Sequence, residues 1–315
     1  MQMPPPIQDW MFLPQGFSPS APAGWGARLR QLLGYKRWIY LLLTAEDHQI
    51  GLAWVDLGYI SKVFGHFSSQ VPGVEPVSVE ALCLGQRQPF RRSGDGWKLQ
   101  AGGQGLRLEM RLEPRPEGGR GILNLSSRKL DLSASWDADP LSLLWADTGQ
   151  PHHTHKSFAQ PATWQIRLPE RQLTAAGLLG ADVSYGWPPR HTRWFWAFAQ
   201  SPALGFNLVE GFTGEAECGL WQQGKLLPLS EASFGMPADI DGAGRDKSWE
   251  IKTHDRILDM RFEPVSRFRD QTQLGLVSSD FIQAYGRFRG RLELPDGGSE
   301  DIDLPGVAEF QDTKW

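Results

Sequence analysis

The chain has 315 residues, of which 40% are hydrophobic and 22% are charged, and its formal net charge is −4. This length can bury one or two hydrophobic cores, and the composition excludes wholesale disorder and a bundle of membrane helices. A dedicated nucleic-acid binder is also excluded, because it would need clustered Lys and Arg. The two cysteines, Cys83 and Cys218, are far apart, which excludes a disulfide scaffold and a cysteine-rich zinc module.

Residues 1–28 are interpreted as an irregular N-terminal arm, because prolines are dense there and no periodicity is visible. The first ten residues, MQMPPPIQDW, lack the basic segment and the apolar run of a signal peptide. No stretch reaches the roughly 18 to 20 apolar residues of a membrane span. The sequence therefore predicts a cytoplasmic protein without an integral membrane segment.

After the arm, short runs of aromatic and branched residues alternate with turn residues, which is typical of all-β proteins. Residues 37–44, 49–59 and 61–68 are such runs, and AEDH at 45–48 suits a hairpin turn between the first two. In LRLEMRLE at 106–113 apolar and charged residues alternate strictly, so this strand has one buried face and one wet face. No helical period persists for more than about two turns. The predicted fold class is all-β.

Similar segments recur in the same order about half a chain apart. WKLQAGGQGLRLEMRLEP (97–114) resembles WEIKTHDRILDMRFEP (249–264), and KRWIY (36–40) resembles TRWFW (192–196). A third pair, GLAWVDLGY and GFNLVEGF, keeps nearly the same offset. These pairs predict an internal duplication, although a chance echo of aromatic hairpins is the alternative. Each half, with about six to nine strands, has the size of an antiparallel barrel or a bent sandwich.

A family resemblance rests on GADVSYGWPPRHTRWFWAF, GFNLVEGF, ECGLWQQGKLLPL and LPGVAEFQDTKW, and on KRWIYLLLTAEDHQIGLAWVDLGY and HHTHKSF nearer the N-terminus. Over almost the whole chain these segments resemble an uncharacterised bacterial family, domain of unknown function 2804. That family is distantly similar to two-domain lipocalin-like proteins, a group that includes carotenoid hydratases and tocopherol cyclases. The resemblance implies two lipocalin-like antiparallel β-barrels. Together with the repeat, it predicts an N-terminal barrel at residues 29–160 and a C-terminal barrel at residues 161–315.

The densest group of candidate functional residues lies between residues 182 and 196. It comprises Asp182, Tyr185, His191, Arg193, Trp194 and Trp196. If RHTRWFWAF is a strand, His191 and Arg193 share one face, and Trp194 and Trp196 lie on the other. We hypothesise an apolar aromatic pocket with Asp182 at its rim, which could bind an isoprenoid or fatty chain and protonate an alkene. Burial would raise the pKa of the acid, and aromatic faces would stabilise a developing cation.

This hypothesis separates two kinds of site residue. The catalytic candidates are Asp182, Tyr185 and His191. The ligand-binding candidates are Trp194, Trp196, Arg193, Glu210, His155 and Lys156. In the alternative interpretation the tryptophans fill the core and Asp182 holds a turn. Asp182 would also be an anchor instead of an acid if Arg190, Arg193 or His191 paired with it.

Three of the seven histidines lie in the segment PHHTHKSF, which raises the question of a metal site. On a strand, His153 and His155 share a face, so a further ligand would have to come from Asp147 or His191. We favour the alternative, in which Lys156 faces a carboxylate in a polar opening. No metal is assigned to the site.

Two acids, Asp56 and Glu210, occupy equivalent positions of the repeat inside apolar strands. An acid in such a place must be paired, exposed or functional. We expect pairing, of Asp56 with Arg37 and of Glu210 with Arg193 on the adjacent strands.

Motifs for nucleotide or metalloenzyme chemistry are absent from the sequence: it contains no P-loop, no Rossmann glycine pattern, no G-x-S-x-G and no H-E-x-x-H. We therefore predict binding of a hydrophobic, lipid- or isoprenoid-like small molecule in a barrel or between barrels. One alternative is a cofactor-independent hydratase, cyclase or isomerase that uses acid catalysis on such a ligand. Another is a structural protein with filled barrels. No cofactor and no nucleic-acid partner are expected, and the oligomeric state and the ligand's identity stay open.

Overall fold

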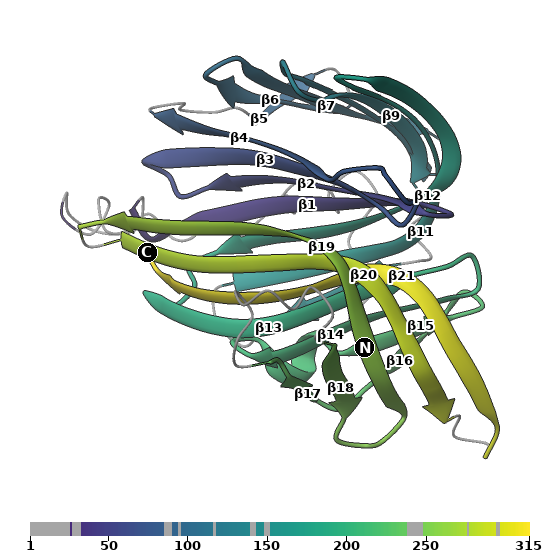
Figure 1. Ribbon diagram of the computed structural model, residues 1–315. Coiled ribbons are helices and arrows are strands. Elements are labelled where there is room, and N and C mark those ends of the chain that lie inside the picture. Colours follow the sequence, from purple (N-terminus) through teal and green to yellow (C-terminus); the bar gives the residue numbers. More distant parts are fainter. Residues whose placement is uncertain are drawn as a thin grey trace. The chain divides into compact units, whose positions relative to one another are not determined.

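The chain is built almost entirely from β-strands (Figure 1). The computed structural model describes residues 26, 33–84, 90–93, 96–115, 118–138, 143–147, 152–237, 248–275, 277–293 and 297–315. The predicted N-terminal arm lies outside the described residues, apart from Gly26. Among the described residues, no helix has the length and apolar character needed to cross a membrane.

The first sheet contains the strands that precede residue 187, and neighbouring strands in it pair in antiparallel fashion. These strands are β1 (Lys36–Ala45), β2 (His48–Asp56), β3 (Ile60–Ser69), β4 (Val77–Leu84), β5 (Phe90–Ser93), β6 (Gly96–Gly103), β7 (Leu106–Arg115), β8 (Gly118–Ser126), β9 (Asp131–Ala138), β10 (Leu143–Asp147), β11 (His152–Leu168) and β12 (Arg171–Gly186). Their order is β4-β3-β2-β1-β12-β11-β9-β8-β7-β6-β5, and β10 pairs with β11. The first strand thus lies beside the last, and β4 approaches β6, which curves the sheet into a lipocalin-like barrel.

The second sheet follows the same plan with fewer strands. They are β13 (His191–Gln200), β14 (Leu204–Gly211), β15 (Gly219–Gln222), β16 (Lys225–Pro228), β17 (Ala232–Gly235), β18 (Trp249–Thr253), β19 (Leu258–Leu274), β20 (Val277–Glu293) and β21 (Ser299–Lys314), with the short 3-10 helix η2 (Gly214–Glu217) after β14. Their order is β16-β15-β14-β13-β21-β20-β19-β18-β17. Here too the first strand pairs with the last, and β17 lies against β14. The fold class predicted from the sequence, two lipocalin-like antiparallel barrels, is confirmed.

Two compact units correspond to the two sheets. Unit 1 ends at Pro188, and unit 2 contains Pro189–Trp315 together with Asp47–Gln49 and Ser68–Pro76. The sequence pattern predicts a boundary near residue 160, and residues 161–188 lie in unit 1 of the structure. The reason is long-range pairing, because β12 supplies the neighbour of β1 and β11 supplies the neighbour of β9.

The surroundings of Gly65 on β3 show which face of the sheet is the interior of the unit 1 barrel. A Cβ at Gly65 would lie 3.2 Å from Leu125 Cδ2 on β8 and 3.6 Å from Leu52 Cδ1 on β2. Leu52 therefore faces the interior, and so do Trp54 and Asp56, because alternate residues of a strand share a face.

The same reasoning assigns the faces of β1. Arg37 contacts Asp56 at 2.8 Å, and its guanidinium lies 5.0 Å from the centre of the Trp54 ring. Odd-numbered residues of β1 therefore face the interior. Trp38 and Tyr40 lie on the opposite side of the sheet, which we call the outer face of unit 1.

A continuous run of aromatic rings lies in the interior of the unit 2 barrel. The Phe206 and Phe288 ring centres are 5.0 Å apart, those of Phe288 and Phe262 are 4.6 Å apart, and those of Phe262 and Trp249 are 6.0 Å apart. Phe206 lies opposite Ala199 on β13. Odd-numbered residues of β13 therefore face the interior, and even-numbered ones face the outer side of unit 2.

Candidate functional site

Asp182 forms a buried ion pair on the outer face of unit 1. It lies opposite Tyr40 of β1 and opposite Lys156 of β11, and residues opposite one another in an antiparallel pair share a face. The Lys156 Nζ is 2.5 Å from Asp182 Oδ1, and the two side chains are 2% and 11% exposed. Lys156 thus faces a carboxylate, as the sequence analysis favours.

This pairing decides what Asp182 can do. An ammonium ion in contact with a carboxyl group stabilises its ionised form. A donor for alkene protonation would have to stay neutral near pH 7, which requires burial without an adjacent cation. The contact with Lys156 does not meet that condition, and Asp182 is placed to anchor Lys156. The partner is Lys156, and not Arg190, Arg193 or His191, the candidates that the sequence analysis considers.

Hydroxyl groups and aromatic rings surround the ion pair on the same face. The Ser184 hydroxyl donates to Thr154 Oγ1 at 2.9 Å and lies 3.4 Å from Asp182 Oδ1. The Trp38 ring lies opposite Ser184, with its centre 5.3 Å from that of His152. All of these side chains except Trp38 are buried. We call this set the unit 1 strip; it comprises Trp38, Tyr40, His152, Thr154, Lys156, Asp182 and Ser184.

Tyr185 and His155 lie on the interior face, so they do not join Asp182. His155 is opposite Val183, and its ring centre is 6.3 Å from that of Tyr185. Burial, assisted by the charge of Lys156, lowers the pKa of His155 from 6.5 to about 3, so the imidazole is neutral at neutral pH. The proposed role of Tyr185 beside an acid has no support from this geometry.

The histidine segment divides between the two faces of β11. The His152 ring lies beside Trp38 on the outer face, and His155 lies inside the barrel. The side chain of His153 is outside the described residues. In the described part of the chain, no group of three or more His, Cys, Asp or Glu side chains is placed to hold a metal ion.

The other predicted site residues belong to unit 2. His191 is exposed and contacts Asp312 at 2.8 Å, and the Arg193 guanidinium lies 5.4 Å from the centre of the Phe310 ring. Trp194 and Trp196 are on the opposite face, as the alternation predicts. The structure therefore assigns Asp182 and His191, which the sequence analysis joins in one site, to different units.

The two acids of the repeat have different partners. Asp56 pairs with Arg37, as predicted. Glu210 instead accepts the backbone N–H of Phe234 at 2.7 Å, and the expected pairing with Arg193 is wrong. Phe234 is on β17, so this carboxylate joins β17 to β14 where the two ends of the sheet approach one another.

The structure also presents a buried acid, Glu309, that is not among the predicted site residues. Glu309 on β21 accepts the indole N–H of Trp194 at 3.0 Å and the amide of Gln283 at 2.7 Å. It lies opposite Trp196 on β13, just as Asp182 lies opposite Tyr40 on β1. KRWIY and TRWFW are similar, and the acids lie opposite the last residue of each segment, Asp182 opposite Tyr40 and Glu309 opposite Trp196. The two acids therefore occupy corresponding positions beside the first strand of each unit. This correspondence cannot be found from the sequence alone, because it depends on which strands are neighbours.

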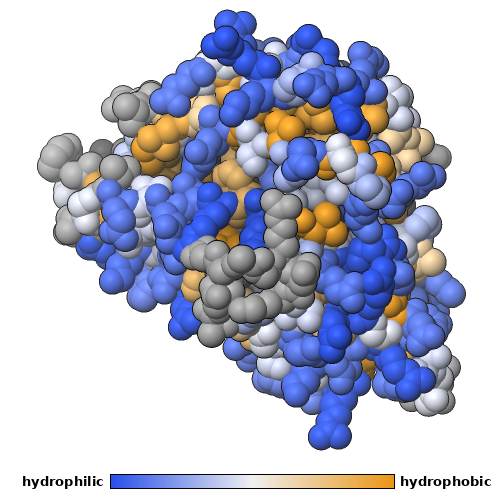
Figure 2. Space-filling view, viewed as in Figure 1, coloured by the Kyte–Doolittle hydropathy of each residue, from blue (hydrophilic) through white to orange (hydrophobic). Residues whose placement is uncertain are grey.

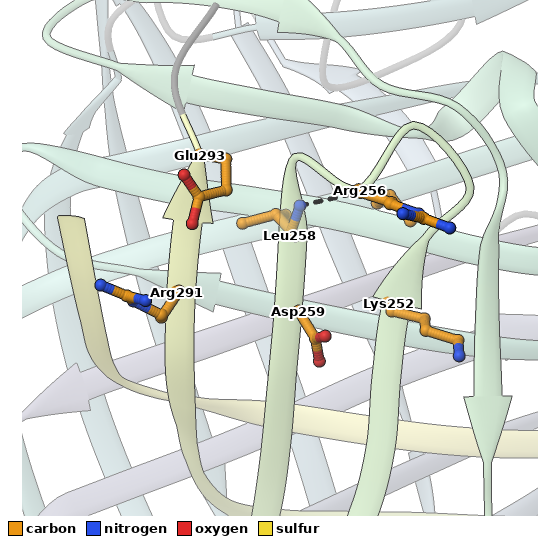
Figure 3. Close-up of a pocket in the computed structure, with 7 residues that line it drawn as sticks. Lys252, Arg256, Leu258, Asp259, Arg291 and Glu293 are labelled. Carbon is orange, nitrogen blue, oxygen red and sulfur yellow. Dashed lines mark hydrogen bonds between the residues drawn. The ribbon is translucent and has the colours of Figure 1, made fainter. Parts of the chain in front are cut away.

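A cavity in unit 2 lies elsewhere and has a different character. It has a volume of about 450 Å³ and is lined by Lys252, Thr253, Arg256, Leu258, Asp259, Arg291 and Glu293. Figure 3 shows Arg291 and Glu293 on β20 and Asp259 on the neighbouring β19. None of the predicted site residues lines it, and its charged side chains do not suit an apolar ligand. On the face shown in Figure 2, the surface is mainly hydrophilic and is interrupted by hydrophobic patches.

Comparison with known proteins identifies the family. A family model described as "Domain of unknown function (DUF2804)" matches residues 22–315. The chain belongs to this family. No curated protein matches it.

Solved structures show where the fold recurs. Kievitone hydratase from Nectria haematococca has a TM-score of 0.55 at 12% identity, with 92% of this chain and 93% of that chain covered. A candidate AttH from Nitrosomonas europaea has a TM-score of 0.51 at 10% identity, covering 87% and 91%. CghA with Sch210972 has a TM-score of 0.52 at 9% identity, covering 89% and 88%. At these identities the likeness establishes the shared fold alone.

Proposed function

We propose that the protein binds a hydrophobic small molecule of the lipid or isoprenoid class, and that the unit 1 strip holds its polar end. The observation that carries this proposal is the buried contact between Lys156 and Asp182. Removing two charges from water is costly, and a buried ion pair generally adds little stability over well-packed apolar side chains. Such a pair on a face with aromatic rings therefore supports a role in recognition.

Packing inside the barrels supports a site on the outer face. The Phe206, Phe288 and Phe262 rings contact one another in the interior of unit 2. In unit 1, a Cβ at Gly121 would lie only 2.0 Å from the Trp136 ring, so that indole occupies the space above the glycine. Interior packing of this kind alone would fit a purely structural protein. The buried charges on the outer face support a role beyond filling the barrels.

The polar groups of the strip define the ligand chemistry. A lysine ammonium donates hydrogen bonds to oxygen acceptors, and Asp182 holds that of Lys156 in place. The rings of Trp38 and His152 provide flat apolar surface next to it. An apolar chain or ring system that ends in a carbonyl, hydroxyl or carboxylate group matches this arrangement.

A second candidate is a cofactor-independent hydratase, cyclase or isomerase that acts on such a molecule. It is favoured by the structural likeness to a kievitone hydratase and to CghA, whose structure contains Sch210972. In this role Lys156 would polarise a carbonyl group by donating a hydrogen bond. Asp182 would orient Lys156 through their contact.

Native mass spectrometry of the full chain purified from its own host tests the binding proposal. We expect an adduct that organic extraction removes, and loss of that adduct in the double variant Lys156→Met/Asp182→Leu. Arg261→Gln, which breaks the exposed Arg261–Glu250 pair, is the matched control and should keep the adduct. A bare wild-type chain that also fails to take up added 1-decanol would contradict the proposal. Conversion of the released molecule on incubation with the protein would select the enzyme.

A further inference from the structure

The cavity of unit 2 lies where β18, β19 and β20 are neighbours in the sheet. Its volume of about 450 Å³ is within the range of small-molecule sites. Thr253 and Leu258 are its buried lining residues, and all the others are charged. The cations are Lys252, Arg256 and Arg291, and the acids are Asp259 and Glu293. With more cations than acids around it, the cavity suits a hydrophilic ligand that carries a negative charge.

The turn between β18 and β19, which carries Arg256, is held by hydrogen bonds. The Asp255 carboxylate accepts the Thr253 hydroxyl at 2.5 Å and the backbone N–H of Ile257 at 3.0 Å. The backbone N–H of Glu293 donates to the Ile257 carbonyl at 2.8 Å, which joins the turn to the end of β20. The backbone N–H of Arg256 donates to the Thr253 carbonyl at 3.0 Å. The backbone on this side of the cavity is therefore ordered already, which lowers the cost of binding a ligand.

The charged side chains of the cavity lack close partners of opposite charge. Lys252 and Arg256 are exposed, and neither forms an ion pair in the part of the chain that the structure describes. Arg291 lies 3.9 Å from Asp301, an acid that is 94% exposed. Asp259 is opposite Lys252 on one side and Arg291 on the other, yet among the described residues it forms no ion pair either. These groups are thus available to a ligand.

The next row of charges on the same face of the sheet is different. Glu250, Arg261 and Arg289 lie opposite one another in this row, two residues along each strand from the row of the cavity. Arg261 contacts Glu250 at 3.1 Å. Arg289 contacts Glu263, and it lies 3.5 Å from Asp303. The charges around the cavity are therefore set apart from a neighbouring surface in which cations and acids pair with one another.

We infer that this cavity binds a small hydrophilic anion that carries hydroxyl groups, of the sugar-phosphate or sugar-acid kind. Figure 3 shows Lys252 and Arg256 on one side of Asp259, and Glu293 on the other side. Ammonium and guanidinium groups bind phosphate and carboxylate oxygens, so Lys252 and Arg256 would take the anionic group. Carboxylates accept hydrogen bonds from hydroxyl groups, so Asp259 and Glu293 would take the hydroxyl end. This site is separate from the unit 1 strip and does not depend on the proposed function.

Saturation-transfer NMR of the full chain with glucose 6-phosphate, gluconate and glucose tests the inference. Both anions should bind and glucose should not, and added sodium chloride should weaken the binding because the side chains are exposed. Tighter binding of glucose 6-phosphate would identify a phosphate ester as the ligand, and tighter binding of gluconate would identify a sugar acid. Inorganic phosphate should bind more weakly than glucose 6-phosphate, because it cannot reach the acids on the other side.

Variants assign the binding to named side chains. Lys252→Gln and Arg256→Gln should each weaken glucose 6-phosphate about fivefold, which is the upper range for an exposed ionic contact. Lys225→Gln is the matched control: Lys225 is exposed on β16 and does not line the cavity, so the affinity should not change. Asp259→Val should reduce the preference for glucose 6-phosphate over inorganic phosphate. Thermal melts of all these variants should match the wild type, because substitutions at exposed positions change stability little.

The same measurements can refute the inference. It is overturned if neither anion binds, if glucose binds as tightly as the anions, or if Lys225→Gln weakens binding as much as Lys252→Gln does. The last result would show that only the overall charge matters. Inorganic phosphate that binds as tightly as glucose 6-phosphate, in the wild type and in Asp259→Val alike, would overturn the role of the acids. The proposed function would survive each of these outcomes, because 1-decanol binding at the unit 1 strip is measured separately.

Discussion

Replacing Lys156 with methionine removes the cation from the buried pair and leaves the Asp182 carboxylate in place. The two side chains are 2% and 11% exposed, so solvent cannot compensate for the lost partner. Asp182 would keep the contact with Ser184 Oγ, at 3.4 Å, which is long for a hydrogen bond. Removing one partner of a buried pair costs about 3 to 5 kcal/mol. We therefore expect the free energy of unfolding of Lys156→Met to fall by about that amount.

Three further variants isolate the cause. Lys156→Met/Asp182→Leu should recover most of the loss, because replacing both partners with apolar side chains of similar volume is close to neutral. Arg167→Met breaks the ion pair between Arg167 and Asp131, in which the arginine is 69% exposed. That change should cost less than about 1 kcal/mol. Asp182→Asn should destabilise the protein much as Lys156→Met does, because it leaves the Lys156 cation buried.

Urea unfolding of the full chain at pH 7, followed by far-ultraviolet circular dichroism, measures these differences. The account predicts the order wild type, Arg167→Met, double variant, Lys156→Met, from most to least stable. If Lys156→Met lay within about 1 kcal/mol of the wild type, or if the double variant were no better than the single one, the pair would not be a buried ionic contact.

Burial lowers the pKa of His66 to about 4 and that of His155 to about 3, so the unfolded chain takes up protons below pH 6.5 that the folded chain does not. The free energy of unfolding should fall by about 2 kcal/mol per histidine between pH 6.5 and 5, and His66→Gln should flatten this slope in a pH series of urea melts. Gly121→Ala would place its Cβ 2.0 Å from the Trp136 ring and should lower the melting temperature, at a cost of about 1 to 3 kcal/mol; an unchanged value in a thermal melt would show that the indole can move. Burial raises the pKa of the Cys218 thiol to about 11, so iodoacetamide at pH 8 should label it only after urea is added, and rapid labelling of the native chain would argue against this burial.

The strands near the N-terminus follow directly from local sequence pattern. The runs at 37–44, 49–59 and 61–68 correspond to β1, β2 and β3, because alternation of apolar residues and the turn at 45–48 are local signals. The faces of β13 were predicted for the same reason, since a strand alternates whatever its neighbours are.

Contacts between distant strands could not be predicted in this way. Lys156 and Asp182 meet only because β11 and β12 form a long hairpin, whose register shifts at a bulge between Ser157 and Gln160. A one-residue change in that register would put the two side chains on opposite faces. Glu210 likewise accepts the backbone N–H of Phe234 only because barrel closure brings β17 next to β14. Both contacts depend on strand register and on barrel closure, and a local sequence pattern predicts neither.

The internal duplication stays a prediction. β18, which contains Trp249, lies three strands from β21 in the sheet order, whereas β6, which contains Trp97, lies five strands from β12. Equivalence of these two hairpins would require two additional strands in unit 1. The pairing of the first strand with the last, by contrast, is the same in both units, which supports the equivalence of Trp38 and Trp194.

Photoaffinity labelling tests the central claim most directly, namely that an apolar molecule binds against the unit 1 strip. The probe is a diazirine-bearing analogue of 1-decanol, cross-linked to the full chain and mapped by peptide mass spectrometry. The account predicts labels in β1, β11 or β12 that excess 1-decanol displaces and that disappear in Lys156→Met/Asp182→Leu. Labels confined to exposed hydrophobic side chains such as Tyr59 and Leu82, and insensitive to competition, would contradict it.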